Sequence, residues 1–305
     1  MTLAARLLAW YDKHGRDLPW RHTRDPYRIL ISEIMLQQTQ VSRGLIFYER
    51  WLAVFPDFGT LAKASNAEVI RMWSGLGYNR RALALRDIAK QVVAEKTSGR
   101  GAGTPPMASD AHWIKFKGIG PYTAAAISAF AFKQRIIPID TNIRRVLGRL
   151  LFGVTYPQPT IDDKIQRAID KILPKTGRYY DVPQALFDLA TLVCTKTPSC
   201  TTCPLRTVCP AGAKFLSGRV RTPKQSIKKS TESRHRNKPY PDRIYRGRIL
   251  SLVTKNKRVA ISTIGPTIDP TFDKKLDHTW LLAMIDRLGK DQLIHKTNSH
   301  ISLPN

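Results

Sequence analysis

A glutamate set among aliphatic residues is the first group in this sequence suited to acid–base chemistry. Residues 27–38 have helical periodicity, and Glu33 shares a face with Ile29, Leu30 and Leu36. Burial among such side chains raises the pKa of a carboxyl group, which can then donate a proton near neutral pH. The alternative is that Glu33 turns sideways into solvent, as an isolated helical glutamate usually does.

A second carboxylate, Asp140, follows an apolar run at residues 136–139 and precedes the next expected helix. The simpler interpretation of Asp140 is an N-cap, because aspartate accepts hydrogen bonds from the first free N–H groups of a helix. A chemical role for this carboxylate depends on what the rest of the chain brings near it.

A turn with two glycines lies at residues 118–120, between helices expected at 109–116 and 121–132. Glycine permits positive φ and a close approach of ligand to backbone, and Pro121 suits the first position of a helix. The outward N–H groups of such a hairpin suit a phosphate. Many helix pairs use a similar turn without a ligand, so this signal is weak when taken alone.

All four cysteines lie close together, in the pattern Cys194-x5-Cys200-x2-Cys203-x5-Cys209. In a reducing compartment such cysteines are better suited to binding a metal than to forming disulfides. Four thiolates fit either a tetrahedral Zn²⁺ ion or an iron–sulfur cluster, and the spacing alone does not choose between them.

The charge balance indicates a polyanionic partner. Fifty lysines and arginines against 23 acidic residues give a formal net charge of +27 over 305 residues. Such an excess favours nucleic acid, whereas a lysine-rich solvated surface explains a modest excess more easily. Arg6 interrupts the first apolar run, and no stretch is apolar enough to span a membrane. We therefore expect an intracellular, cytoplasmic protein with no membrane contact.

Helical periodicity dominates the chain before residue 255, and further helices are expected at residues 3–14, 45–55, 58–64, 67–75, 80–94, 142–152, 161–172 and 184–193. Residues 214–248 then hold twelve lysines and arginines against Glu232 and Asp242. This composition predicts a flexible linker that can also bind phosphates. Beyond it, helices near 243–254 and 275–288 and a hairpin at 293–303 resemble a small winged helix.

Several short runs resemble the helix-hairpin-helix DNA glycosylases of the endonuclease III superfamily, and within it the adenine DNA glycosylases. The similarity covers residues 5–211. The discriminating run is Ser-Glu-Ile-Met-Leu-Gln-Gln-Thr-Gln, at residues 32–40, where thymine- and pyrimidine-directed relatives differ. The other matching runs are Leu-Pro-Trp-Arg at 18–21, Gly-Leu-Gly-Tyr at 75–78, Gly-Ile-Gly at 118–120 and Asp-Thr-Asn at 140–142.

The resemblance implies an all-α fold of the helix-hairpin-helix glycosylase type, and the helix and hairpin pattern beyond the linker adds a small C-terminal winged-helix-like module. A glycosylase core at residues 1–212 would contain two domains. The six-helix domain with the hairpin would take residues 22–133, and residues 1–21 with 134–212 would form a helical iron–sulfur domain. A basic linker at 213–241 and the winged-helix-like domain at 242–305 would follow.

The same resemblance implies a role for each candidate catalytic residue. Glu33 would protonate adenine, at N7, while Asp140 would stabilise an oxocarbenium-like sugar, following the two-carboxylate logic of glycoside cleavage. Asn142 would position Asp140 or the attacking water. Relatives that also cut the backbone have a lysine at the position of Tyr122, where it forms a Schiff base with the sugar. A tyrosine therefore predicts removal of the base alone.

Contacts to double-stranded DNA containing a mismatched adenine are implied in the same way. The residues of the hairpin would hold a phosphate, and the glutamines with the tyrosine would fill the gap left by a flipped nucleotide. The residues expected to contact DNA are Trp20, Arg21, Gln37, Gln38, Tyr78, Lys117, Gly118 and Gly120.

Relatives in this family hold a [4Fe–4S] cluster with cysteines spaced x6-x2-x5, so the first loop here is one residue shorter. In this helical context we favour the cluster over Zn²⁺ at Cys194, Cys200, Cys203 and Cys209. The Nudix-like domain with which the family reads 8-oxoguanine is not recognisable after the linker, which leaves the preference between 8-oxoguanine and guanine open.

The expected protein is thus a monomer that removes adenine mispaired with 8-oxoguanine or guanine. A thymine glycosylase acting on G·T pairs is the alternative within the same class. A non-catalytic DNA-binding iron–sulfur protein is the alternative from a different class.

Overall fold

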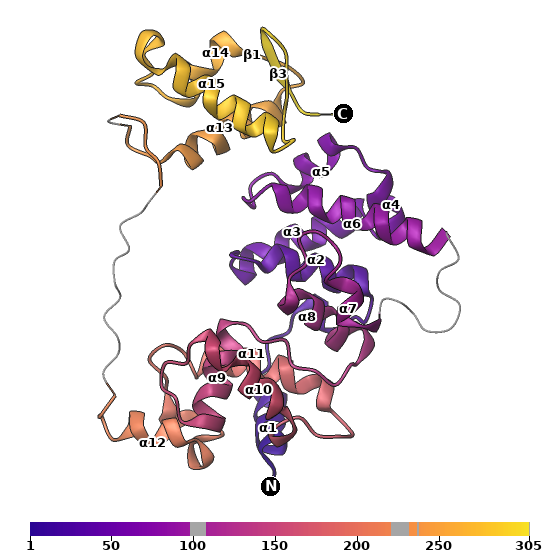
Figure 1. Ribbon diagram of the computed structural model, residues 1–305, viewed down its shortest axis with the longest axis vertical. Coiled ribbons are helices and arrows are strands. Elements are labelled where there is room, and N and C mark those ends of the chain that lie inside the picture. The colour runs from indigo at the N-terminus through magenta and orange to yellow at the C-terminus, as the bar shows by residue number, and fades with distance from the viewer. Residues whose placement is uncertain (98–107, 221–231, 237, 305) are drawn as a thin grey trace. The chain divides into compact units, whose positions relative to one another are not determined.

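The computed structural model of the chain describes residues 1–97, 108–220, 232–236 and 238–304. Helices make up most of this part of the chain, which confirms the expected all-α class (Figure 1). Residues 99–106, for which the sequence predicts a loop, lie outside the described residues, as do residues 221–231 of the expected linker. None of the described helices is both long and apolar enough to cross a membrane.

The chain forms two compact units, one of residues 1–33 and 102–225, the other of residues 34–101 and 226–305. We call them unit 1 and unit 2. The four-part domain division expected from the sequence stays a prediction.

Unit 1 contains the hairpin, the cysteines and both candidate catalytic carboxylates. Its α-helices are α1 (Leu3–His14), α2 (Pro26–Leu36, which continues into unit 2), α7 (Asp110–Trp113), α8 (Pro121–Phe132), α9 (Thr141–Phe152), α10 (Asp162–Arg167), α11 (Val182–Leu192) and α12 (Pro210–Leu216). Short 3-10 helices lie between them: η1 (Pro19–Arg21), η3 (Pro159–Ile161), η4 (Ile169–Lys171), η5 (Tyr179–Asp181), η6 (Cys200–Thr202) and η7 (Arg206–Val208).

A core around α9 holds the cysteine-containing part of unit 1 together. The side chains of Leu7 on α1, Leu147 on α9 and Leu186 on α11 are fully buried in one cluster. Burying a leucine side chain contributes roughly 1.5–3 kcal/mol. Since α9 begins directly after Asp140, the packing of α9 in this core also fixes the position of the Asp140 side chain.

The prediction of a single helix at residues 161–172 is wrong. The backbone of Ala168 leaves the α-helical region at φ −103° and ψ 8°, and Ala168 N–H bonds to the carbonyl of Ile165. The segment is therefore split into η3, α10 and η4. Ile165 and Ile172 are nevertheless both buried, because the tighter turns keep the apolar positions on one side.

Unit 2 combines a helical layer with the C-terminal module. Its helices and strands are α3 (Val41–Val54), α4 (Phe58–Lys63), α5 (Asn66–Trp73), α6 (Arg80–Thr97), α13 (Asp242–Lys255), β1 (Val259–Ala260), α14 (Ile261–Ile268), α15 (Lys274–Lys290), β2 (His295–Lys296) and β3 (His300–Ser302). Ile70 of α5 and Leu83 of α6 share a buried cluster with the module.

The order of elements in the module is that of a winged helix, as expected. The strands form an antiparallel sheet in the order β1-β3-β2, with Val259 opposite Ile301 and His295 opposite Ser302. Helix α14 and strand β1 were not predicted. Helix α14 contains Pro266, a residue that disfavours helix interiors, and the Phe272 ring packs so close to Gly265 that a side chain at Gly265 would clash.

Candidate active site

Glu33 lies on α2 among side chains that exclude water. The side chains of Ile29 and Leu30, one turn earlier, are at most 1% exposed, and that of Ile34 is 3% exposed. Glu33 itself is half-buried. Burial raises the pKa of Glu33 to about 7, a hydrogen bond from the Tyr122 hydroxyl opposes this shift, and the charge of Asp140 adds to it. The carboxyl group can thus hold a proton near neutral pH.

Tyr122 is the second residue of α8, and its hydroxyl donates to Glu33. Burial raises the pKa of Tyr122 well above its usual value, and the charges of Glu33 and Asp140 raise it further. The ring lies edge-on to Phe187 of α11, with the ring centroids 6.3 Å apart. Tyr122 therefore stays protonated and orients the Glu33 carboxyl group.

Asp140 is the N-cap of α9, as the simpler interpretation expected. Its Oδ1 atom accepts from the N–H groups of Asn142 (2.8 Å) and Ile143 (2.7 Å), and its Oδ2 atom from Asn142 Nδ2 (2.8 Å). These three N–H donors fix the position and orientation of the Asp140 carboxyl group. The cap also places this carboxylate near Glu33 and Tyr122, because its charge acts on both.

Three elements of unit 1 thus bring together an acid with a raised pKa, a fixed hydroxyl and an anchored anion. Glu33, Tyr122 and Asp140 lie close enough for their charges to act on one another, and Asn142 bonds to Asp140. A carboxyl group that holds its proton near neutral pH and a second, anchored carboxyl group beside it can divide the work of cleaving a glycosidic bond.

The hairpin before α8 has the expected form. Gly118 has φ +100°, in the region that favours glycine, and Gly120 is the N-cap of α8 without any side-chain hydrogen bond. A Cβ atom added at Gly120 would meet nothing within 4 Å, and Lys117 is exposed beside it. The first N–H groups of this 12-residue helix are therefore accessible to an anion.

Within unit 2, a residue that sequence reasoning missed connects the predicted DNA-contact loops. The Arg81 guanidinium donates to the carbonyls of Ile34 (2.8 Å), Gln37 (2.5 Å) and Gly77 (3.1 Å). It also lies over the ring of Tyr78, 5.3 Å from its centroid. Its partners are backbone carbonyls and an aromatic face, which no sequence pattern marks.

The two loops that Arg81 joins are conformationally constrained. Gln38 has φ 56° and Tyr78 has φ 49°, values that non-glycine residues seldom adopt. The Tyr78 side chain is 64% exposed, and Gln38 is exposed as well. An exposed ring on a strained loop is a feature associated with function rather than with packing.

The side chains of Trp20 and Arg21 are buried. Both nitrogens of the Arg21 fork donate to Asp188, at 2.7 and 2.8 Å, and Arg16 also pairs with this carboxylate. Asp188 is completely buried, and Trp20 is 7% exposed. The contact of these two residues with DNA stays a prediction. They fasten the segment after α1 onto α11.

The four cysteines line one pocket, together with Arg149, Pro198, Arg206 and Phe215. The donor set of four thiols fits an iron–sulfur cluster, and two N–H groups point at sulfur: Gly212 N–H to Cys209 Sγ at 3.3 Å and Arg149 to Cys194 Sγ at 3.5 Å. Within the described residues, no group of three or more His, Cys, Asp and Glu side chains is arranged to hold a single metal ion.

Helix α9 connects this pocket to the carboxylates. Arg145 donates to the carbonyls of Cys194 (2.7 Å) and Ala190 (3.0 Å). The fully buried Arg149 donates to the carbonyls of Thr155, Thr195 and Lys196. The helix capped by Asp140 is thus bonded directly to the loop that begins at Cys194.

Comparison with known families agrees with this geometry. Residues 31–175 match the model of the HhH-GPD superfamily of base excision DNA repair proteins. This region, which contains both carboxylates and the hairpin, belongs to that superfamily.

More particularly, the chain is homologous to adenine DNA glycosylases. The adenine DNA glycosylase of Mycobacterium tuberculosis is 36% identical over 194 residues, which are 63% of this chain and 62% of that protein. The chain therefore spans less than two thirds of this relative's length.

Among solved structures, a thermostable thymine-DNA glycosylase matches with a TM-score of 0.61 and 28% identity, over 69% of this chain and 95% of that one. A trapped covalent intermediate of endonuclease III with DNA matches with a TM-score of 0.56 and 18% identity, over 70% and 95% of the two chains. The second likeness supports the fold alone.

Proposed function

We propose that this protein hydrolyses the N-glycosidic bond of adenine mispaired with guanine or 8-oxoguanine in double-stranded DNA. The observation that carries the proposal is the pair of Glu33, whose pKa is raised to about 7, and Asp140, held by three N–H donors. Homology to adenine DNA glycosylases over 63% of the chain supports adenine as the base.

In the proposed reaction Glu33 donates its proton to the flipped adenine, at N7, because the neutral base is a poor leaving group. Asp140 stabilises the positive charge that develops on the sugar, and a water molecule then completes the hydrolysis. Asn142 keeps the Asp140 carboxylate in place through its side-chain amide. Tyr122 has no amine and cannot form a Schiff base, so the backbone stays intact.

DNA contacts are proposed at the hairpin and at the loops joined by Arg81. The N–H groups at the start of α8 would hold a phosphate, with Lys117 beside them. Gln37, Gln38 and Tyr78 would occupy the space that the flipped nucleotide leaves.

Thymine opposite guanine is the second candidate substrate, since a thymine-DNA glycosylase is 28% identical to this chain. A panel of duplex oligonucleotides carrying adenine or thymine opposite guanine or 8-oxoguanine separates the two candidates. We expect loss of adenine only, with strand cleavage after hot alkali and none without it. Loss of thymine, or cleavage without alkali, would contradict the proposal.

The proposed cofactor is a [4Fe–4S] cluster held by Cys194, Cys200, Cys203 and Cys209, with Zn²⁺ as the alternative. Such a cluster would brace the loop that Arg145 and Arg149 bond to α9. Analysis of protein purified without oxygen should find about four iron and four sulfide ions per chain. About one zinc ion and no sulfide would establish the alternative.

Replacing Arg81 with methionine should impair base flipping, because the loops with Gln37 and Tyr78 would lose the guanidinium that joins them. We expect a roughly tenfold lower rate of adenine release at limiting enzyme, and a weaker fluorescence rise from 2-aminopurine placed beside the target. Arg71→Met, at an exposed position on α5, is the matched control. Equal rates for both variants would remove Arg81 from substrate positioning.

A further inference from the structure

The C-terminal module presents one helix face that its own core does not use. Helix α15 turns Asp277, Trp280, Leu281, Met284, Ile285 and Leu288 inward. Its other side exposes basic, small and hydroxyl-bearing side chains: Lys274, Lys275, His278, Thr279 and Ala283. Leu276 is 54% exposed on the same turn as the lysines. We call these six residues the α15 face.

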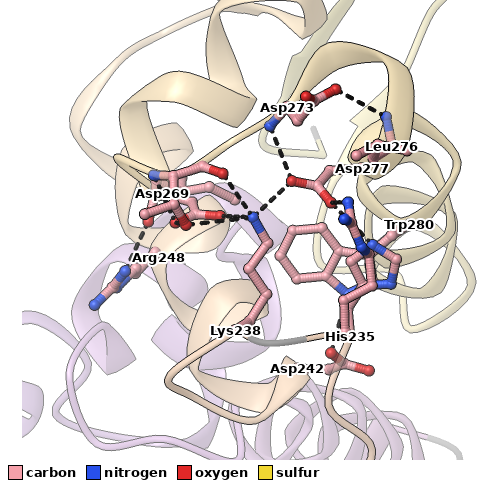
Figure 2. A network of polar contacts seen from close by, with 12 residues as sticks. His235, Lys238, Asp242, Arg248, Asp269, Asp273, Leu276, Asp277 and Trp280 are labelled. Atoms are coloured by element: carbon pink, nitrogen blue, oxygen red, sulfur yellow. Dashed lines mark hydrogen bonds and ion pairs between the residues drawn. The ribbon is translucent and has the colours of Figure 1, made fainter.

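Two carboxylates beside this helix, Asp269 and Asp277, are buried, whereas Asp273 at its N-terminus and Asp286 on its outer side are exposed. Figure 2 shows Lys238 between two aspartates, with Nζ 2.6 Å from both Asp269 and Asp277. Lys238 Nζ also donates to the carbonyl of Thr271 (2.9 Å). Desolvation raises the pKa of Asp277, but the hydrogen bond from the Asp273 backbone N–H and the ammonium group of Lys238 lower it to about 2. Arg236 also lies 3.4 Å from Asp277, so two cations balance these two buried aspartates.

The segment before α13 fastens the first turn of α15. His235 stacks on Trp280, with ring centroids 4.8 Å apart and planes 11° from parallel, and contacts Asp277 Oδ1 at 3.0 Å (Figure 2). Trp280 Nε1 donates to Asp242 (3.0 Å), the first residue of α13. Asp273 caps α15 by accepting from Lys275 N–H (2.8 Å) and Leu276 N–H (3.0 Å). Lys274 and Lys275 therefore lie in a first helical turn that is held in place by its N-cap.

The hairpin between β2 and β3 extends this module with more polar and basic groups. His295, Lys296, Thr297 and Asn298 are all exposed. Lys296 pairs with Asp286 of α15 (2.6 Å), which ties the hairpin to the helix and neutralises an acidic residue of that helix. Helices α14 and α15 are joined by residues 269–273, and they have the arrangement of a helix-turn-helix with an added wing.

We propose that the α15 face and the β2–β3 wing form a second site for double-stranded DNA, in addition to the hairpin before α8. Helix α15 would enter a major groove, where Thr279 and Ala283 can contact base edges and methyl groups. Lys274 and Lys275 would neutralise phosphates of the flanking backbone, and the wing would contact the adjacent strand. This inference goes beyond the proposed function, because binding here requires no catalysis.

The test compares the full-length chain with the double variant Lys274→Ala/Lys275→Ala, binding an undamaged duplex across a salt series followed by fluorescence anisotropy. Each lost phosphate contact lowers the salt slope by about 0.9, so the slope should fall by about two and the affinity about tenfold at ~0.1 M salt. At saturating protein, the single-turnover rate on a mispaired duplex should not change. Lys90→Ala/Lys96→Ala, at exposed positions on α6, removes the same charge elsewhere.

An unchanged affinity and slope in the Lys274/Lys275 variant would overturn the proposal, as would an equal loss in the α6 control. The first result is also what a face that binds another protein would give. If the wild-type chain released no adenine while the variant still bound DNA more weakly, the proposed function would fail and the second DNA site would stand. Unaltered thermal unfolding of both variants checks that the fold is intact.

Discussion

Glu33→Gln should lower the single-turnover rate of adenine release by about 10²–10⁴-fold, the range that a positioned general acid contributes. Glutamine keeps the size of the side chain and can still accept from the Tyr122 hydroxyl, but it has no proton to give to the base. The affinity for mispaired duplex DNA should change little. Base release is measured by alkali cleavage of a labelled oligonucleotide, and affinity by anisotropy.

Glu49→Gln is the matched control for this variant, because Glu49 is an exposed glutamate on α3. Its rate should equal that of the wild type. If Glu33→Gln retained the wild-type rate, Glu33 would have no part in the chemistry, and the non-catalytic alternative would gain support. If it lost both rate and DNA affinity, its role would be structural.

Asp140→Asn should slow adenine release by about 10²-fold or more, since the variant loses the charge that stabilises the developing cation. Stability should be nearly unchanged, because asparagine is as good an N-cap as aspartate and keeps an oxygen for the N–H groups of Asn142 and Ile143. Single-turnover assays and thermal unfolding together separate these two effects.

The same variant has a second readout in its pH dependence. The charge of Asp140 raises the pKa of Glu33, so its removal lowers that pKa. The remaining activity should therefore begin to fall at a lower pH than in the wild type. A wild-type rate, or a falling limb at higher pH, would show that Asp140 does not act on this site.

The carboxylates of the site could be foreseen because local pattern and chemistry agree at both positions. Aliphatic residues at helical spacing placed Glu33 in a water-poor environment, and an apolar run before a helix placed Asp140 at an N-cap. Their proximity did not follow from either pattern, since the two residues belong to elements far apart in the chain. It came from the family resemblance, and their roles in catalysis stay predictions.

Side chains whose partners are backbone carbonyls or distant acids could not be foreseen. Arg81 and Arg149 look like ordinary helical arginines in the sequence, yet each donates to several carbonyls from other segments. Arg21 stood in a run shared with DNA glycosylases, and its buried partner Asp188 lies in another helix. Long-range pairing of this kind leaves no local periodicity to detect.

In the C-terminal module the main helices were predicted because they have strong periodicity, whereas α14 was hidden by its glycine and proline. Gly265 is required by the close approach of the Phe272 ring, a contact made across the turn. Strand β1 is only two residues long, too short for an alternating pattern.

The pH dependence of adenine release, measured in single turnover for the wild type and for Glu33→Gln, tests the central claim most directly. Because the pKa of Glu33 is raised to about 7 and its protonated form is the reactive one, the wild-type rate should be high below pH 7. Above that pH it should fall about tenfold per unit. The variant should be slow and lack this falling limb. A wild-type rate that stays constant or rises through pH 7, or a variant with the same falling limb, would contradict a proton donated by Glu33.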